Sequence, residues 1–134
     1  MNAADLAALV DELSNDPLSR GYSGMTVEAV AVDINTKYRS ANRSSMTGSE
    51  IWEATVGADF AALTAEKKGQ WLAFCGIESV DPFGPASDFA IYIFGVGSAT
   101  IQTLAALRNE PTSRAVELFG FAVTAGDVEI ARAQ

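Results

Sequence analysis

Residues that end helices recur at short intervals along the chain, and this spacing limits what it can fold into. Asn15-Asp16-Pro17, Gly76, Pro111 and Gly120 each follow a segment whose apolar residues have helical spacing. Proline disfavours helical geometry in the residue before it, and glycine readily adopts the left-handed conformation that ends helices. We therefore expect an all-α fold, with residues 1–134 forming a single compact domain of several short-to-medium helices joined by irregular connections.

The first half of the chain contains three helix signals. Over residues 3–14 the apolar positions repeat at intervals of three and four, which predicts an amphipathic helix. Thr26 is placed to cap a second helix, because its hydroxyl can accept from the first free backbone amides. Thr47 and Glu50 have the spacing of a capping box, which predicts a short helix over about 48–55.

The second half contains further helix signals and one ambiguous segment. Thr64 opens a helix that Gly76 is expected to end in a left-handed conformation. On its buried side we expect Trp71, Leu72, Phe74 and Cys75. The aromatic and β-branched residues of 89–94 favour a strand, yet no second convincing strand is available to pair with it, so we assign helix. Further helices are expected after Ser98, over about 113–119 and over about 125–133.

Two segments read as irregular connections. Residues 36–46 are polar and hold three of the nine cations, and residues 77–88 contain two of the four prolines. The stretch 19–46 carries four cations and two anions, so it has a net charge of +2 while the rest of the chain has −10. Its cations are either solvated loop residues or a basic docking patch for an acidic neighbour. The candidate interface residues are Arg20, Tyr22, Lys37, Arg39 and Arg43, although Tyr22 could instead cover the end of the first helix.

Composition excludes several classes of function. The 134 residues include no histidine and one cysteine, Cys75, so one chain offers no zinc site, no Ser-His-Asp triad and no disulfide. We expect Cys75 to be a small buried hydrophobe and both tryptophans, Trp52 and Trp71, to lie in the core, with an interface role requiring them to be exposed. A net charge of −8 argues against binding the backbone of a nucleic acid. We predict no catalytic, cofactor-binding or metal-binding residue.

The N-terminus and the apolar segments indicate where the protein is made and whether it enters a membrane. The N-terminus lacks the basic region of a secretory signal, and the most apolar window, residues 89–96, is far shorter than the roughly 20 residues that span a bilayer. We expect a protein made in the cytosol that does not act at a membrane.

Two patterns could in principle carry chemistry. Residues 95–100 read GVGSAT, a glycine-rich string before a helix, which is the arrangement of a phosphate loop. The third glycine and the lysine of such loops are missing, so a plain turn between helices is favoured. Glu50, Glu53 and Asp59 could supply a pair of carboxylates for acid–base catalysis, but Glu50 has a capping role and the others read as helix surface.

Two segments resemble a known family. They are NDPLSRGYSGMT at residues 15–26 and SRAVELFGFAVTAGDVEIARA at residues 113–133. Together they resemble a family of small proteins encoded with the virion structural genes of tailed bacteriophages and prophages. The matching residues are Asp16, Pro17, Gly21, Tyr22, Gly24 and Met25 in the first segment and Ser113, Arg114, Glu117, Leu118, Gly120, Asp127, Val128 and Arg132 in the second.

The residues of the second segment also have a purely structural interpretation. Arg114 and Arg132 lie on either side of the Gly120 turn, where each could pair with Glu117 or Asp127 and fix two short helices.

The resemblance implies a role in the virion or in its assembly. We therefore expect a non-enzymatic structural protein that contacts other phage structural proteins or copies of itself in a ring, with the head–tail connector as one position. The alternative is a soluble acidic inhibitor or regulator that mimics nucleic acid and binds a host protein, which the charge of −8 permits.

Overall fold

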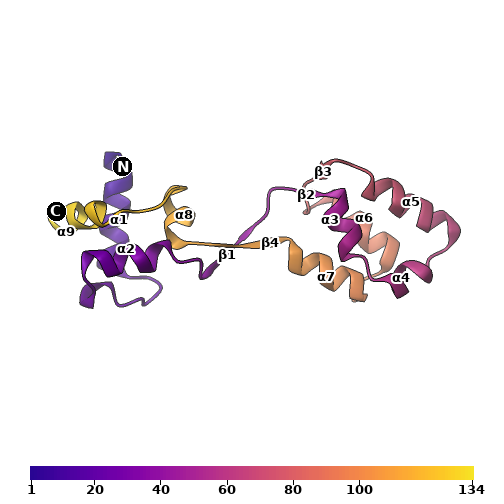
Figure 1. Cartoon of the computed structure of the whole chain (residues 1–134), viewed down its shortest axis with the longest axis horizontal. Coiled ribbons are helices and arrows are strands. Elements are labelled where there is room, and N and C mark those ends of the chain that lie inside the picture. Colours follow the sequence, from indigo (N-terminus) through magenta and orange to yellow (C-terminus); the bar gives the residue numbers. More distant parts are fainter. The chain divides into compact units, whose positions relative to one another are not determined.

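The computed structural model describes residues 1–134 and is mostly helical, as the sequence predicts (Figure 1). It is not purely all-α, because it contains four short strands. These are β1 (Arg39–Asn42), β2 (Met46–Thr47), β3 (Ser79–Val80) and β4 (Asn109–Thr112). The packing divides into two compact units: unit 1 comprises residues 1–41 and 111–134, and unit 2 comprises residues 42–110.

Unit 1 combines the two ends of the chain. Its helices are α1 (Ala3–Asn15), the 3-10 turn η1 (Tyr22–Gly24), α2 (Val27–Asn35), α8 (Arg114–Phe119) and α9 (Ala125–Arg132). Its buried core consists of Leu9, Tyr22, Val30, Ile34, Ala115, Val123, Val128 and Ala131. Because α9 contacts both α1 and α2, residues from opposite ends of the sequence bury one another.

Side chains at the helix ends explain where the helices of unit 1 begin and stop. The Thr26 hydroxyl accepts from the Ala29 amide at 3.1 Å and caps α2, as predicted. Thr124 and Asp127 form a capping box at the start of α9. Gly120 ends α8 with φ 79°, a left-handed conformation that glycine adopts without steric cost.

Unit 2 is a continuous piece of chain. Its helices are α3 (Gly48–Ala54), α4 (Gly57–Ala61), α5 (Ala65–Cys75), α6 (Pro85–Phe94) and α7 (Ala99–Leu107). Its buried core consists of Met46, Ile51, Trp71, Ala90 and Ile93. Several aromatic rings add to this core, and the Trp71 ring meets that of Phe94 edge to face at 4.8 Å between centroids.

The ambiguous segment 89–94 is helical and forms the second half of α6, as we assigned it. Pro85 occupies the first turn of α6, where a missing backbone donor costs nothing. Ala90 and Ile93, three residues apart, bury one face of the helix in the core. None of the helices combines the length and the apolar character that crossing a membrane requires.

The two predicted connections contain regular structure, which corrects the expectation that they are irregular throughout. Residues 36–46 include β1 and the start of β2, and residues 77–88 include β3 and the start of α6. β1 pairs with β4, and β2 pairs antiparallel with β3 so that Met46 lies opposite Val80. A short ladder needs only backbone donors and acceptors, so polar segments form it once distant residues approach.

Gly48 marks a close approach between two elements of unit 2. A Cβ atom at this position would lie 2.1 Å from the carbonyl oxygen of Cys75 and 2.5 Å from that of Ile77. The first turn of α3 therefore packs directly on the backbone at the end of α5, and only glycine fits there.

Gly76 stops α5, as predicted, but in a different conformation. Its φ is −82°, so the expected left-handed cap is wrong. The chain then leads into β3.

Candidate protein interaction site

The predicted basic residues are mostly engaged in ion pairs. Arg20 meets Asp33 at 2.7 Å and 3.1 Å, and its guanidinium lies 3.9 Å from the centre of the Tyr38 ring. Arg39 pairs with Glu117 at 2.9 Å. The structure therefore balances the charge of each of these arginines with a carboxylate of the same chain.

The other three residues of the predicted interface differ in burial and in their partners. Arg43 belongs to unit 2 and pairs with Glu50 at 2.7 Å. Lys37 is exposed. Tyr22 has no exposed surface, and burial raises the pKa of its hydroxyl. Tyr22 is therefore a core residue of unit 1, which agrees with a structural role for it and leaves it no surface for a partner.

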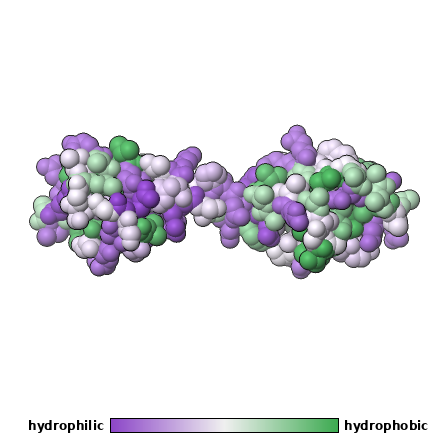
Figure 2. Space-filling model, turned by 90° about the horizontal axis from the view of Figure 1, so that it is seen from below, coloured by the Kyte–Doolittle hydropathy of each residue, from purple (hydrophilic) through white to green (hydrophobic).

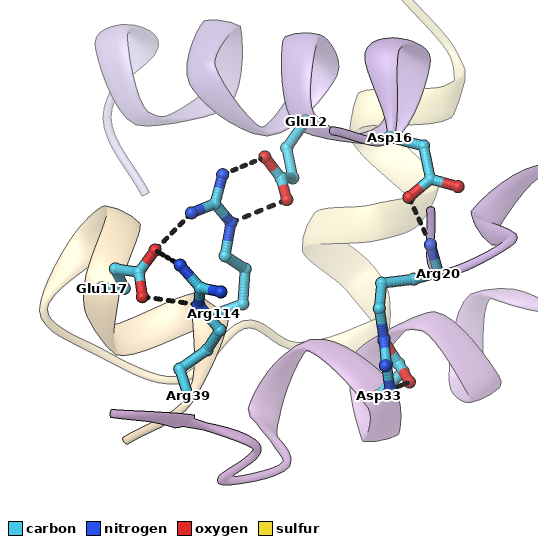
Figure 3. Close-up of polar contacts among 7 residues, drawn as sticks. All are labelled: Glu12, Asp16, Arg20, Asp33, Arg39, Arg114 and Glu117. Carbon is cyan, nitrogen blue, oxygen red and sulfur yellow. Dashed lines mark hydrogen bonds and ion pairs between the residues drawn. The ribbon is translucent and has the colours of Figure 1, made fainter. Parts of the chain in front are cut away.

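A chain of charged side chains crosses unit 1 (Figure 3). Arg114 donates to both carboxylate oxygens of Glu12 at 2.8 Å and also contacts Glu117, which in turn holds Arg39. The Glu12 side chain is only 4% exposed and that of Arg114 14%. The hydrogen bonds that Arg114 donates to Glu12 raise the pKa of Arg114, and the hydrogen bonds from Arg39 lower the pKa of Glu117. The network joins α1, α8 and β1.

The two motif segments contact each other in unit 1. Arg132 of the second segment donates to the carbonyl oxygen of Tyr22 in the first at 2.6 Å. The Asp16 carboxylate accepts from the backbone amides of Arg20 and Gly21, both at 2.7 Å, and fixes the turn before η1. The motif residues thus build one part of the fold.

The alternatives left open for the second segment are now decided. Of the two predicted partners of Arg114, Glu117 and Asp127, the structure shows a pair with Glu117. Arg132 does not pair with Asp127, because Asp127 caps α9 and Arg132 reaches η1 instead.

The glycine-rich string forms a turn between α6 and α7, as favoured. Gly95 and Gly97 both have positive φ, 88° and 85°. The first turn of α7 already holds a carboxylate, since the Thr100 amide and hydroxyl donate to one oxygen of Asp59 at 2.8 Å and 2.7 Å. Asp59 therefore occupies the place that a phosphate takes in a phosphate loop.

The carboxylates considered for catalysis have separate partners. Glu50 accepts from the Thr47 amide at 3.1 Å as well as pairing with Arg43, and these contacts lower its pKa to about 2. Asp59 binds Thr100, and Glu53 is exposed. No group of three or more cysteine and acidic side chains is arranged to hold a metal ion.

One surface of unit 2 has the composition of a protein contact. Trp71 is fully buried, but Trp52 is 43% exposed and Leu72 is 51% exposed. They line a shallow hollow together with Ser49, Glu53, Cys75 and Gly76, which we call the Trp52 surface. Figure 2 shows that hydrophobic residues reach the surface elsewhere on both units as well.

The exposure of Leu72 corrects the prediction that it is buried. Trp71 and Leu72 are neighbours on α5, and successive residues of a helix point about 100° apart. The Trp71 ring takes the core side, where its indole N–H donates to the Thr55 hydroxyl at 3.0 Å. Leu72 consequently faces outward beside Trp52. The neighbouring Cys75 is half-buried, and burial raises the pKa of its thiol to about 11.

Charge is evenly divided between the units, although it is uneven along the sequence. Unit 1 has five cations and nine anions and unit 2 has four cations and eight anions, so each has a net charge of −4. Two cations of residues 19–46, Arg39 and Arg43, pair with anions from outside the stretch, Glu117 and Glu50. Folding thus offsets the excess positive charge of this stretch.

No protein-family model matches the chain, and no curated protein or solved structure is significantly similar to it. What the protein does must therefore be inferred from its own residues and their arrangement.

Proposed function

We propose that this chain is a non-enzymatic structural or assembly protein of a tailed-phage particle. It is made in the host cytoplasm and enters the virion through contacts with other structural proteins or with copies of itself. The head–tail connector is the position to test first.

The observation that carries the proposal is the Trp52 surface. A half-exposed tryptophan beside an exposed leucine in a shallow hollow is the arrangement of an interface anchor, because such residues lose most apolar surface when a partner covers them. The Trp52 ring is held in place by an edge-to-face contact with Phe60 at 5.2 Å, so little side-chain freedom is lost on binding.

The motif segments give the proposal its phage context. The residues that resemble the phage family are drawn from both ends of the chain and contact each other in unit 1 through Arg132 and Tyr22. The phage context of the proposal rests on this sequence resemblance.

The acidic inhibitor is the less favoured alternative. A mimic of nucleic acid concentrates its carboxylates on one surface, whereas here the excess of four anions is the same in each unit. Several of these carboxylates are also already paired with arginines.

Particles provide the test. Gradient-purified phage from a host that carries the gene is analysed by quantitative mass spectrometry, and the isolated protein by light scattering. We expect the protein in the particles at the copy number of a ring. Absence from the particles, combined with a stable monomer in solution, would overturn the proposal and favour the regulator.

A pair of variants then tests the Trp52 surface. Trp52→Ala with Leu72→Ser is expected to reduce incorporation into particles at least tenfold, because the anchor side chains are lost. Val32→Ser, at a 70% exposed position of unit 1, is the matched control and should incorporate normally. Normal incorporation of the Trp52 and Leu72 variant would show that this surface is not the contact.

A further inference from the structure

Unit 2 contains an apolar cavity of about 120 Å³ beneath α6 and α7. The Trp71 ring, Ile101 and Leu104 contribute to its wall, and apart from Ser87 and Arg108 every lining residue is apolar. Its size is comparable with that of a dry engineered cavity of about 150 Å³ that binds benzene. The space therefore fits an apolar group of about six carbon atoms.

Arg108 is the only arginine of this chain whose guanidinium has no acceptor. The other five donate to Asp33, Glu117, Glu50, Glu12 and the carbonyl oxygen of Tyr22. Arg108 follows α7 directly, and its guanidinium carbon lies 4.8 Å from the centre of the Phe83 ring. Its Nε is buried and has no hydrogen-bond partner. Since Nε is closed to a water-sized probe, the two terminal nitrogens of the guanidinium are the donors that Arg108 has left for a ligand in the cavity.

We propose that this cavity binds a small carboxylate with a compact apolar group, of the class of hexanoate. The apolar group fills the space between α6 and α7, and the carboxylate accepts from N–H groups of the two terminal nitrogens of Arg108. Guanidinium and carboxylate match in this bidentate geometry, which a neutral alcohol cannot reproduce. Small-molecule sites commonly combine apolar walls with a few polar groups that fix orientation.

The selectivity of the site comes from its local contacts and not from the net charge of unit 2. Unit 2 has a net charge of −4, so long-range attraction does not bring an anion here. Binding must come from burying the apolar group together with the one local cation. A short carboxylate such as acetate lacks the first contribution, and hexan-1-ol lacks the second.

The test is a titration of the full-length protein, labelled with nitrogen-15, followed by NMR. Hexanoate, acetate and hexan-1-ol are added separately. We expect hexanoate to shift the signals of the Arg108 Nε–H and the Trp71 indole N–H in a saturable way. Acetate and hexan-1-ol should each bind about tenfold more weakly or worse. Equal binding of hexanoate and hexan-1-ol, or shifts confined to residues away from the cavity, would overturn the proposal.

Three variants separate the two contributions. Arg108→Gln is expected to lower the affinity for hexanoate about tenfold while leaving that for hexan-1-ol unchanged. Lys68→Gln removes the same charge from unit 2 without touching the cavity and should bind normally. Ala105→Leu fills the cavity and should abolish binding of both compounds, with thermal unfolding confirming that it folds.

Ala86→Leu serves the same purpose as Ala105→Leu at another lining position, should the first variant fail to fold. Unchanged hexanoate binding in Arg108→Gln, or in a folded cavity-filling variant, would refute the site. None of these measurements depends on phage particles, so they are independent of the proposed structural role.

Discussion

At the scale of single residues, burial decides what each ion pair contributes to stability. The Glu12 side chain is 4% exposed and Arg114 holds both of its oxygens, whereas the Arg20 side chain in the pair with Asp33 is 35% exposed. Removing one partner of a buried pair leaves a charge without compensation, but a partly exposed pair is screened by water.

We predict that Glu12→Gln lowers the free energy of unfolding of unit 1 by about 3 kcal/mol, because Arg114 is left in a buried site with only Glu117 as partner. Arg20→Gln should cost much less, because water screens its pair with Asp33. Urea unfolding followed by circular dichroism measures both values. Similar costs for the two variants would contradict the ranking by burial.

A second residue-scale prediction concerns pH and Glu50. Hydrogen bonds from Arg43 and Thr47 lower its pKa from the usual 4.5 to about 2. A carboxylate with a depressed pKa stabilises the fold fully above about pH 4.5, and this contribution is lost as the pH falls towards 2. Glu50→Gln should therefore flatten the decline in the stability of unit 2 over this range.

The measurement is the urea midpoint from tryptophan fluorescence at several pH values between about 6 and 2. Glu53→Gln, on the same helix and without an ion pair, is the control and should keep the slope of the wild type. A slope in Glu50→Gln equal to that of the wild type would argue against the ion pair with Arg43.

At the scale of helices and strands, local signals were predictable and long-range ones were not. The caps at Thr26 and Thr47 follow from residues at or next to the start of each helix, and the structure confirms both. The pairing of Met46 with Val80 joins residues far apart in sequence, and the flanking residues give no signal of it. Arg39 and Glu117, which form an ion pair, are also far apart in sequence and have no local signal of their contact.

The candidate sites divide in the same way. Tertiary packing decides whether Trp71 or Leu72 is buried. The sequence of α5 alone does not determine this, so Leu72 was wrongly predicted to be buried. The cavity beside Arg108 arises where α6 and α7 meet, so no single segment encodes it.

Gly48 provides an element-scale prediction. Gly48→Ala should destabilise unit 2 by about 3 kcal/mol or prevent its folding, because the new methyl group collides with backbone carbonyl groups at the end of α5. Gly69→Ala, within α5 and with open space around it, should instead stabilise by about 0.5–1 kcal/mol. Thermal unfolding compares the two. Equal behaviour would mean that α3 does not pack on α5 as described.

At the scale of the whole molecule, each unit has its own core. Both tryptophans belong to unit 2, so tryptophan fluorescence follows that unit alone, while circular dichroism follows the helices of both.

We predict that Val128→Ala, which truncates a fully buried core residue of unit 1, lowers the stability of that unit by about 2 kcal/mol. The unfolding transition seen by circular dichroism should then separate into two phases, with the fluorescence transition unchanged. An equal shift of both signals would indicate a single cooperative unit.

The route of the chain through the units also has a consequence during synthesis on the ribosome. Unit 2 lies entirely within residues 42–110, whereas unit 1 needs residues 111–134 to supply α8 and α9. Unit 2 can therefore fold before α8 and α9 have been translated. Until then the apolar faces of α1 and α2 remain uncovered. During this interval α1 and α2 are the segments of the nascent chain that most need protection from aggregation.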